Sequence, residues 1–177
     1  MLSAIATGEI RNNVNYEDFA NVFKVFSYAP FFEDWSTSMV SDVYTSFDVE
    51  DGSIFGYYLD NNCVGILTLR PMVNGEHPVY YPNGTKVMYL SDVATLPECR
   101  SMGIGTQLFL HGIRHTNILG YDFMYLRTNE KSVSMSYRIA EKCGFSQIWD
   151  LCEEVEFPRT SSFIPTKDLR IFMEKKL

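Results

Sequence analysis

Apolar positions along this chain recur with two different spacings, which predict both helices and strands. From Glu17 to Ser27 they recur every three or four residues, the spacing of a helix with one buried face. Asn15 precedes this segment and is suited to cap the helix, and Pro30 follows it and ends the helix. The same spacing predicts a second helix over residues 34–47.

Three segments in the middle of the chain have the composition of strands. Residues 53–59 and 63–69 are two apolar runs separated by Asp60-Asn61-Asn62, a short polar segment suited to a hairpin turn. Gly65 in the second run is typical of a bulge or of close approach by another part of the chain. After a loop rich in glycine, proline and asparagine, residues 87–95 form a further strand, which we expect to be central.

The rest of the chain continues the alternation without a linker or a repeat. A β-α-β unit through residues 87–128 should have a right-handed crossover and parallel strands. We therefore expect a single domain over residues 1–177, with a mixed sheet and helices on both faces. The remaining predicted elements are a helix over 104–119 with Leu108, Ile113 and Ile118 inward, a strand over 121–128, a helix over 132–142, a strand from Phe145 and a last strand over 169–173.

The composition of the 177 residues limits the classes of function. The formal net charge of −7 disfavours nucleic acid as a partner, since a phosphate backbone attracts a basic surface. No apolar run is long enough to predict a membrane span, and the lack of a signal-like N-terminus favours a cytoplasmic location. The four cysteines form no C-x-x-C pair and no zinc-like spacing, so we expect free thiols and no metal site.

The six residues from Arg100 to Gly105 lie between the central strand and the helix that follows it. Two glycines at such a junction allow a ligand to approach the backbone, and the first amides of a helix bind phosphate. A P-loop does not match, because Thr106 and Gln107 follow Gly105 in place of Lys-Ser or Lys-Thr. A dinucleotide fingerprint does not match either, because Leu108 stands where its third glycine belongs.

What remains is R-x-x-G-x-G after an apolar strand, which closely resembles motif A of the GCN5-related N-acetyltransferases. The segment from Lys142 to Phe145 is similar to the K-x-G-F of this family, and Phe172 to Lys175 resembles its closing strand. The resemblance implies an α/β fold with a central mixed β-sheet, splayed between the fourth and fifth strands and flanked by helices on both faces. It also implies acetyl-CoA as co-substrate and a primary amine, on a small molecule or a peptide, as acceptor.

The resemblance further implies a set of cofactor-binding residues. The end of the central strand would pair its main chain with the pantetheine amides, as an additional strand does, through Val93, Ala94 and Thr95. Asn129 with Ser132 or Ser136 would flank the pantetheine or sulfur end. The pyrophosphate would contact the loop residues Arg100, Ser101, Met102, Gly103, Ile104, Gly105 and Thr106.

The family's usual acid does not match this sequence. Many relatives carry a tyrosine four residues before the glycine of the G-F pair to protonate the leaving thiolate, and Ala140 stands there. Tyr137, about one helical turn earlier on the same face, is the alternative acid, or it only packs on the cofactor. Asp92 on the central strand is the candidate base for the amine proton, or only a hydrogen-bond acceptor at the strand end.

Two classes of function stay open. The first is an N-acetyltransferase in which the amine attacks the thioester directly, without a covalent enzyme intermediate. The second is a module of the same fold that binds or senses acyl-CoA with little or no turnover, which Ala140 favours. A nucleotide phosphotransferase is disfavoured by the missing P-loop lysine. The sequence does not determine the acceptor or the oligomeric state, a homodimer included.

Overall fold

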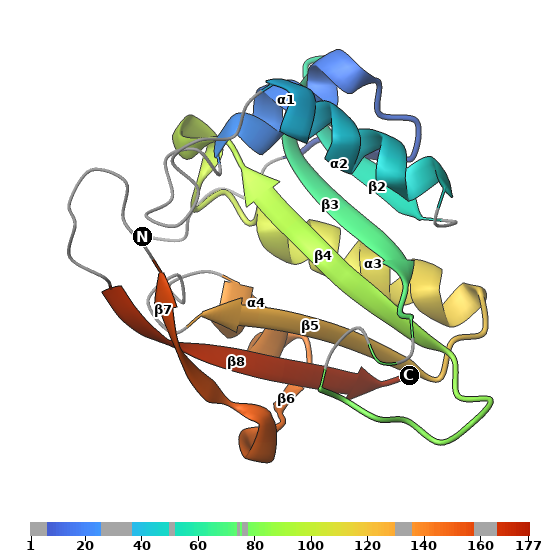
Figure 1. Ribbon diagram of the computed structural model, residues 1–177. Helices are drawn as coiled ribbons and strands as arrows, with labels where there is room; N and C mark the ends of the chain where they lie inside the picture. Colours follow the sequence, from blue (N-terminus) through green and yellow to red (C-terminus); the bar gives the residue numbers. More distant parts are fainter. Residues whose placement is uncertain are drawn as a thin grey trace.

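The computed structural model describes residues 7–25, 37–49, 52–73, 75, 78–129, 136–157 and 166–177. Its strands form one eight-stranded sheet in the order β1-β2-β3-β4-β5-β8-β6, with β7 paired to β8 (Figure 1). The strands are β1 (Glu9–Arg11), β2 (Ser53–Leu59), β3 (Asn62–Pro71), β4 (Val87–Thr95), β5 (Phe123–Asn129), β6 (Ser146–Gln147), β7 (Glu153–Phe157) and β8 (Thr166–Lys176). The helices are α1 (Tyr16–Phe23), α2 (Thr37–Val49), α3 (Ile104–Ile118) and α4 (Ser136–Lys142), with short 3-10 turns η2 (Pro97–Cys99) and η3 (Trp149–Leu151).

The sheet is mixed. β4 and β5 pair in parallel, and the other described pairs are antiparallel. α3 connects β4 to β5, so these three elements are the predicted β-α-β unit. The expected mixed α/β sheet is therefore confirmed.

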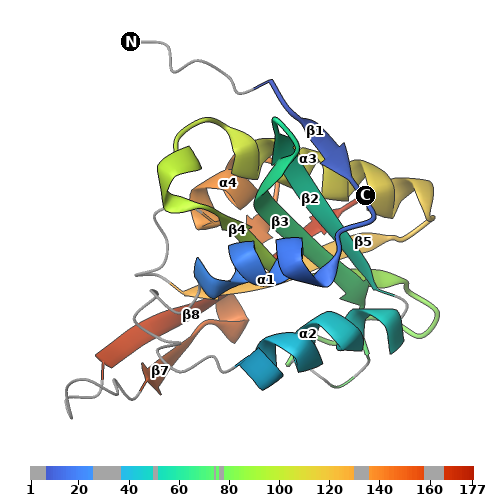
Figure 2. The same ribbon diagram turned by 90° about the horizontal axis from the view of Figure 1, so that it is seen from above.

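Helices cover both faces of the sheet. Seen from above, α1 and α2 lie on one side of β2, β3 and β4, and α3 and α4 lie on the other (Figure 2). Along β3, Leu67 and Leu69 pack in the core that contains Leu108 of α3. Ile66, which precedes Leu67 and points to the opposite face, packs in the core that contains Phe19 of α1. Both cores are built from side chains that alternate along the same strands, as the period of two requires.

Two glycines allow α3 to lie close against β3. A Cβ on Gly65 would stand 2.9 Å from Cγ2 of Ile104, and one on Gly112 would stand 2.7 Å from Cδ2 of Leu67. The register between β2 and β3 also shifts next to Gly65, so this position combines the predicted bulge with the predicted close approach. The contact fixes the first turn of α3 beside the end of β4.

The N-terminal helix begins as predicted. The amide of Asp18 donates a hydrogen bond to Oδ1 of Asn15 over 2.8 Å, which caps α1. α1 ends at Phe23 and is followed by a 3-10 turn at residues 24–25. Pro30 and the first residues of the second predicted helix lie outside the described residues.

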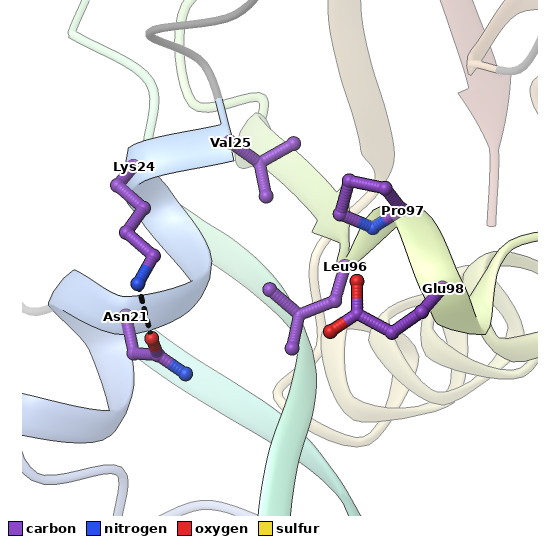
Figure 3. A pocket seen from close by; sticks show the side chains of 6 residues that line it. All are labelled: Asn21, Lys24, Val25, Leu96, Pro97 and Glu98. Carbon is purple, nitrogen blue, oxygen red and sulfur yellow. Dashed lines mark hydrogen bonds between the residues drawn. The ribbon is translucent and has the colours of Figure 1, made fainter.

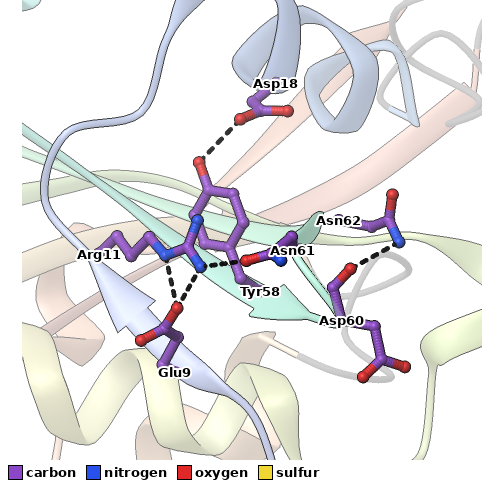
Figure 4. A network of polar contacts seen from close by, with 7 residues as sticks. All are labelled: Glu9, Arg11, Asp18, Tyr58, Asp60, Asn61 and Asn62. Carbon is purple, nitrogen blue, oxygen red and sulfur yellow. Dashed lines mark hydrogen bonds and ion pairs between the residues drawn. The ribbon is translucent and has the colours of Figure 1, made fainter.

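The hairpin between β2 and β3 is tied to the sheet edge. Asp60 and Asn61 both adopt left-handed conformations, with φ of 47° and 64°, as a two-residue hairpin turn of type I′ requires. Arg11 of β1 donates to Oδ1 of Asn61 over 2.7 Å and lies over the ring of Tyr58 (Figure 4). The Tyr58 hydroxyl donates to Asp18 over 2.9 Å, which joins this edge to α1.

Candidate active site

β4 and β5 separate towards their carboxyl ends. They pair in parallel from Val87 with Phe123 to Leu90 with Leu126. Beyond that point, β4 continues to Thr95 paired with β3, and β5 continues paired with β8. The main-chain edge of β4 after Leu90 therefore faces an opening between two strands, which we call the fork. Ligands of open α/β sheets bind at such carboxyl-end openings.

A bulge in β4 lies at the fork. Thr68 of β3 pairs with Asp92 and Leu69 pairs with Leu90, so Ser91 is an extra residue. Because the bulge shifts the alternation, Leu90 and Val93 both contribute to the core on the α3 side. Asp92 points to the opposite side of the sheet, where its Oδ2 accepts a hydrogen bond of 2.8 Å from the Thr68 hydroxyl. The bulge thus directs the Asp92 carboxylate to the side of the sheet on which α1 and α2 lie.

The bulge also buries a hydroxyl. Within the described part of the chain, Oγ of Ser91 has no hydrogen-bond partner, although it is shielded from solvent. An unsatisfied buried hydroxyl is unfavourable for stability. It lies at the point where β4 leaves β5.

The loop after β4 is shaped to bind an anion. Gly103 caps α3 in a left-handed conformation with φ of 80°, and a Cβ there would meet no atom within 4 Å. The first intrahelical hydrogen bond runs from the Gln107 amide to the Gly103 carbonyl over 3.1 Å. The amides of Ile104, Gly105 and Thr106 therefore have no acceptor within the helix, and they carry the partial positive charge of its N-terminus. The arrangement suits a phosphate group.

The remaining loop residues differ in exposure. Arg100, Ser101 and Gly103 are exposed, and Met102 is half-buried against the α3-side core. A Cβ on Gly105 would stand 3.0 Å from Cδ1 of Ile139, so this glycine also allows α3 and α4 to pack closely.

A cavity of about 380 Å³ adjoins this loop (Figure 3). It lies between the carboxyl end of α1 and the segment after β4. Lys24, on the α1 side, donates to Oδ1 of Asn21 over 2.6 Å. Leu96, on the other side, is held by a hydrogen bond of 2.9 Å from its amide to the Val64 carbonyl. The lining residues are Asn21, Lys24, Val25, Leu96, Pro97 and Glu98.

The environment of Asp92 suits a proton acceptor. Burial raises the pKa of this carboxyl group above its usual value. The hydrogen bond from Thr68 and the charges of Arg127 and Arg70 act in the opposite direction, with a smaller effect. A carboxylate with a raised pKa is a stronger base than one in water, which is the property that amine deprotonation requires.

Tyr137 lies in the first turn of α4 and is engaged on the far side of β5. Its hydroxyl donates to Oε1 of Gln147 over 3.3 Å, and Gln147 donates to Sγ of Cys152 over 3.1 Å. Gln147 belongs to β6, which is separated from β5 by β8, whereas the fork lies on the β4 side of β5. Ala140 is fully buried in the core, so no hydroxyl group stands at the position of the family's usual acid.

The other predicted ligands follow β5. Asn129 is the last residue of β5 and pairs with Arg170 of β8. Ser136 is the first residue of α4. Ser132 lies outside the described residues. The structure thus brings Val93, Ala94, Thr95 and the glycine loop together on one side of the fork, with Asn129 and Ser136 at the end of the strand on the other side.

Three arginines and a tyrosine lie on the same face as Asp92 and were not predicted from the sequence. Cζ of Arg70 lies 4.9 Å from the ring centroid of Tyr89, which precedes the bulge. Arg127 is exposed at the end of β5. Burial and the charge of Arg127 lower the pKa of Arg170. These residues come from four strands, β3, β4, β5 and β8. The signal available in the sequence was the alternation within β5, where Met124 and Leu126 point to the face covered by α3, and Tyr125 and Arg127 point to the other face.

Three further observations concern the class of protein and site. The four cysteines are unpaired thiols. Among the residues described, no group of three or more His, Cys, Asp or Glu side chains is arranged to hold a metal ion. Of the helices in the described ranges, none combines the length and the apolar character needed to cross a bilayer.

Comparison with known proteins identifies the class. The sequence profile of the Acetyltransferase (GNAT) family matches residues 21–145, which is more than half of the chain and includes β4, the glycine loop and α4. The chain therefore belongs to the GNAT acetyltransferase family. No curated protein matches the chain in sequence.

Solved structures of acetyltransferases share the fold. An N-acetyltransferase from Staphylococcus aureus Mu50 has a TM-score of 0.70 at 14% identity, covering 97% of this chain and 99% of its own. A phosphinothricin acetyltransferase from Sinorhizobium meliloti, in complex with acetyl-CoA, has a TM-score of 0.74 at 14% identity over 97% and 89% of the two chains. A putative acetyltransferase from Salmonella typhimurium with its cofactor acetyl-CoA has a TM-score of 0.69 at 15% identity over 97% and 95%. At these identities the likeness is one of fold, and it includes the sheet expected from the sequence.

Proposed function

We propose that this protein is an acetyl-CoA-dependent N-acetyltransferase that moves the acetyl group to a primary amine by direct attack. One observation carries the proposal: an unpaired strand edge at the fork leads directly to the glycine loop at the start of α3. An extended amide-containing ligand pairs with such an edge, and a diphosphate fits such a helix start. The acetyl-CoA bound in two similarly folded acetyltransferases supports the same cofactor here.

The cofactor would lie along β4. Its pantetheine amides would pair with the main chain of Val93, Ala94 and Thr95, past the last β4–β5 pair. Its pyrophosphate would lie against the amides of the loop from Arg100 to Thr106, with Arg100 as a cation. Its sulfur end would then reach the fork, flanked by Asn129 with Ser132 or Ser136.

The reaction forms a bond from the amine nitrogen to the thioester carbonyl carbon and breaks the bond from that carbon to sulfur. The amine attacks only when neutral, so its proton must leave, and the Asp92 carboxylate at the fork is the proposed acceptor of that proton. Backbone amides at the fork stabilise the oxyanion that develops on the thioester oxygen. The thiolate of coenzyme A takes up one proton and departs.

Tyr137 is the proposed donor of that proton. Its phenol would have to leave Gln147 and rotate towards the fork, because the hydrogen bond to Gln147 holds it on the β6 side. The same observation favours a second candidate function, a module that binds acyl-CoA with little turnover. The fully buried Ala140 supports this alternative as well.

One experiment separates the two candidates. Calorimetry measures binding of coenzyme A, and release of free thiol from acetyl-CoA measures turnover with a panel of primary amines. The enzyme binds coenzyme A and releases thiol only when an amine is present. Binding without amine-dependent release contradicts the enzyme and supports the binding module. Failure to bind coenzyme A contradicts both.

A further inference from the structure

One buried hydroxyl group at the fork has no partner in the described part of the protein. Oγ of Ser91 is shielded from solvent and forms no hydrogen bond there. Two other buried hydroxyls are satisfied: Thr68 donates to Oδ2 of Asp92 over 2.8 Å, and Thr116 donates to the Gly112 carbonyl over 2.8 Å. Buried polar groups of folded proteins are almost always hydrogen-bonded, so the exception at Ser91 indicates a bond that is made to a ligand.

The side chains of Ser91 and Asp92 lie on the same face of the sheet. Met88 and Leu90 pack in the core on the α3 side, so Ser91, which alternates with them, points to the other face. The bulge then interrupts the alternation, and Asp92 points to that face as well. A hydroxyl and a carboxylate therefore follow one another on one face of β4.

Ser91 is also the first residue of β4 that β5 leaves unpaired. Leu90 forms the last pair with β5, opposite Leu126, and the two strands separate beyond this pair. The residue as a whole is half-buried, although its Oγ is covered. A serine has one side-chain torsion with three staggered positions, so the hydroxyl can turn towards a ligand that enters between the strands. It breaks no hydrogen bond within the described residues when it does so.

The proposed path of the cofactor brings the thioester to this point. With the pyrophosphate on the loop after β4 and the pantetheine amides on Val93 to Thr95, the sulfur end runs back towards the start of the fork. Ser91 lies two residues before Val93, and two residues of a strand span about 6.6 Å. The two methylene groups and the sulfur that follow the last pantetheine amide are of comparable length, so the thioester carbonyl lies beside Ser91 and Asp92.

We propose that the Ser91 hydroxyl donates a hydrogen bond to the carbonyl oxygen of the bound thioester and is a catalytic residue of the acetyl transfer. This inference rests on the proposed function. As the amine attacks, the carbonyl oxygen gains negative charge, and the hydroxyl stabilises that charge together with the backbone amides at the fork. The hydroxyl forms no covalent bond and keeps its own proton, so Asp92 remains the acceptor of the amine proton.

The stability of the free protein gives the first test. Ser91→Ala should unfold at the same temperature as the parent or at a higher one, because it removes an unsatisfied buried group. Thr116→Val is the matched control, since it removes a fully buried hydroxyl that has a partner. The unfolding temperature of this control should fall, and its kcat should be unchanged. A lower unfolding temperature in Ser91→Ala would mean that the hydroxyl is bonded within the free protein, and it would overturn the proposal.

Turnover gives the second test. Ser91→Ala should lower kcat for thiol release from acetyl-CoA by about 100-fold, the effect of removing one oxyanion donor. Its affinity for coenzyme A should be unchanged, because coenzyme A lacks the thioester carbonyl. Ser91→Thr, which keeps a hydroxyl group on Cβ, should retain most of the activity. An unchanged kcat in Ser91→Ala would overturn the proposal, and so would a loss of coenzyme A affinity in this variant.

A spectroscopic measurement keeps this inference separate from the proposed function. Acetyl-CoA with an isotopic label at its carbonyl carbon is bound to the parent and to Ser91→Ala without an acceptor amine, and infrared difference spectra are recorded. We expect the carbonyl band of the parent at lower frequency, because a hydrogen bond to the oxygen weakens the C=O bond. This shift, without turnover of any amine, supports the contact and contradicts the acetyltransferase activity. Equal bands in the two proteins contradict the contact, whether or not the protein acetylates an amine.

Discussion

The two arms of the fork use different chemistry. On the β4 arm, the features that suit a cofactor are main-chain groups: a free strand edge, a left-handed glycine and the first amides of α3. On the β5 arm, the candidate features are side chains, namely Tyr137 and the residues that follow the strand. The β4 arm agrees with the pattern of the family, whereas the β5 arm departs from it at Ala140. Cofactor binding can thus be retained while the catalytic side chains of a relative differ.

The largest effect is expected on the β4 arm, from Gly103→Glu. A carboxylate at the start of α3 would meet the pyrophosphate, and like-charge contact costs several kcal/mol, so coenzyme A affinity should fall by roughly 1,000-fold. Calorimetry measures the affinity. Gly84→Glu is the matched control, because Gly84 and Gly103 have φ of 88° and 80° and a Cβ on either would meet no atom within 4 Å.

The control separates strain from repulsion. Equal loss of affinity in the two glutamate variants would mean that backbone strain, rather than the site, is responsible. Gly105→Glu is less informative, because a Cβ at Gly105 approaches Ile139 of α4 within 3.0 Å and would disturb helix packing. Full affinity in Gly103→Glu would exclude the loop as the pyrophosphate site.

A smaller effect is expected from Asp92→Asn, which removes the proposed base. The value of kcat should fall by about 100-fold, within the range for general base catalysis, and affinity for coenzyme A should be unchanged. In the parent protein kcat should rise with pH through the raised pKa of Asp92, because only the ionised carboxylate accepts a proton. Asp150→Asn, an exposed position, is the control. A variant with unchanged kcat and the same pH profile would remove Asp92 from the mechanism.

The same variant has an effect on stability with a definite sign. Because burial raises the pKa of Asp92 in the folded state, folding shifts its equilibrium towards the protonated form relative to the unfolded chain. The contribution of this carboxyl group to the free energy of unfolding is fully present at low pH, and it is lost as pH rises through the folded-state pKa. Thermal unfolding should therefore show Asp92→Asn gaining stability over the parent above that pKa and losing the advantage as pH falls to the usual pKa of an aspartate. A constant difference across this range would contradict the burial of an ionisable carboxyl group.

The smallest effect is expected on the β5 arm, from Tyr137→Phe. A thiolate is a weakly basic leaving group, so help from an acid is of limited value, and kcat should fall by about tenfold. Gln147→Leu, which removes the partner that holds the phenol, should leave kcat equal or higher. Tyr80→Phe, at an exposed tyrosine, is the control. If Tyr137→Phe weakens coenzyme A binding as much as it slows turnover, the tyrosine only packs on the cofactor.

Periodicity along the sequence predicted the segments that form the β4 arm. The strand expected over 87–95 is β4 with the same bounds, and the helix expected over 104–119 is α3. One of the three positions predicted to face inward in that helix was wrong: Leu108 is buried and Ile113 packs against the core, but Ile118 is 82% exposed. The buried stripe runs through Leu108, Gly112 and Thr116, because Gly112 is small enough to touch β3 and the Thr116 hydroxyl donates to the Gly112 carbonyl over 2.8 Å. Burial of residues that are not apolar hides such a stripe from a hydrophobic pattern.

Features of the β5 arm were harder to predict because they depend on contacts between distant segments. β7 was missed, since three of its five residues are glutamates and its stability comes from pairing with β8. The bulge at Ser91 was missed because it is a property of the register between β3 and β4. The grouping of Arg70, Arg127 and Arg170 on one face depends on the registers of β3, β4, β5 and β8 together, and no local spacing in the sequence contains these registers. Asp92 was predicted as a candidate base, but its partner Thr68 became visible only in the fold.

The central claim is that coenzyme A lies along the free edge of β4 with its diphosphate on the start of α3. The most direct measurement is the change of backbone amide resonances of the whole protein as coenzyme A is added. We expect the largest changes at Val93 to Thr95 and at Ser101 to Thr106, with small changes along β1 and α2. Resonances of these two segments that stay in place, while coenzyme A binds elsewhere on the protein, would contradict the account.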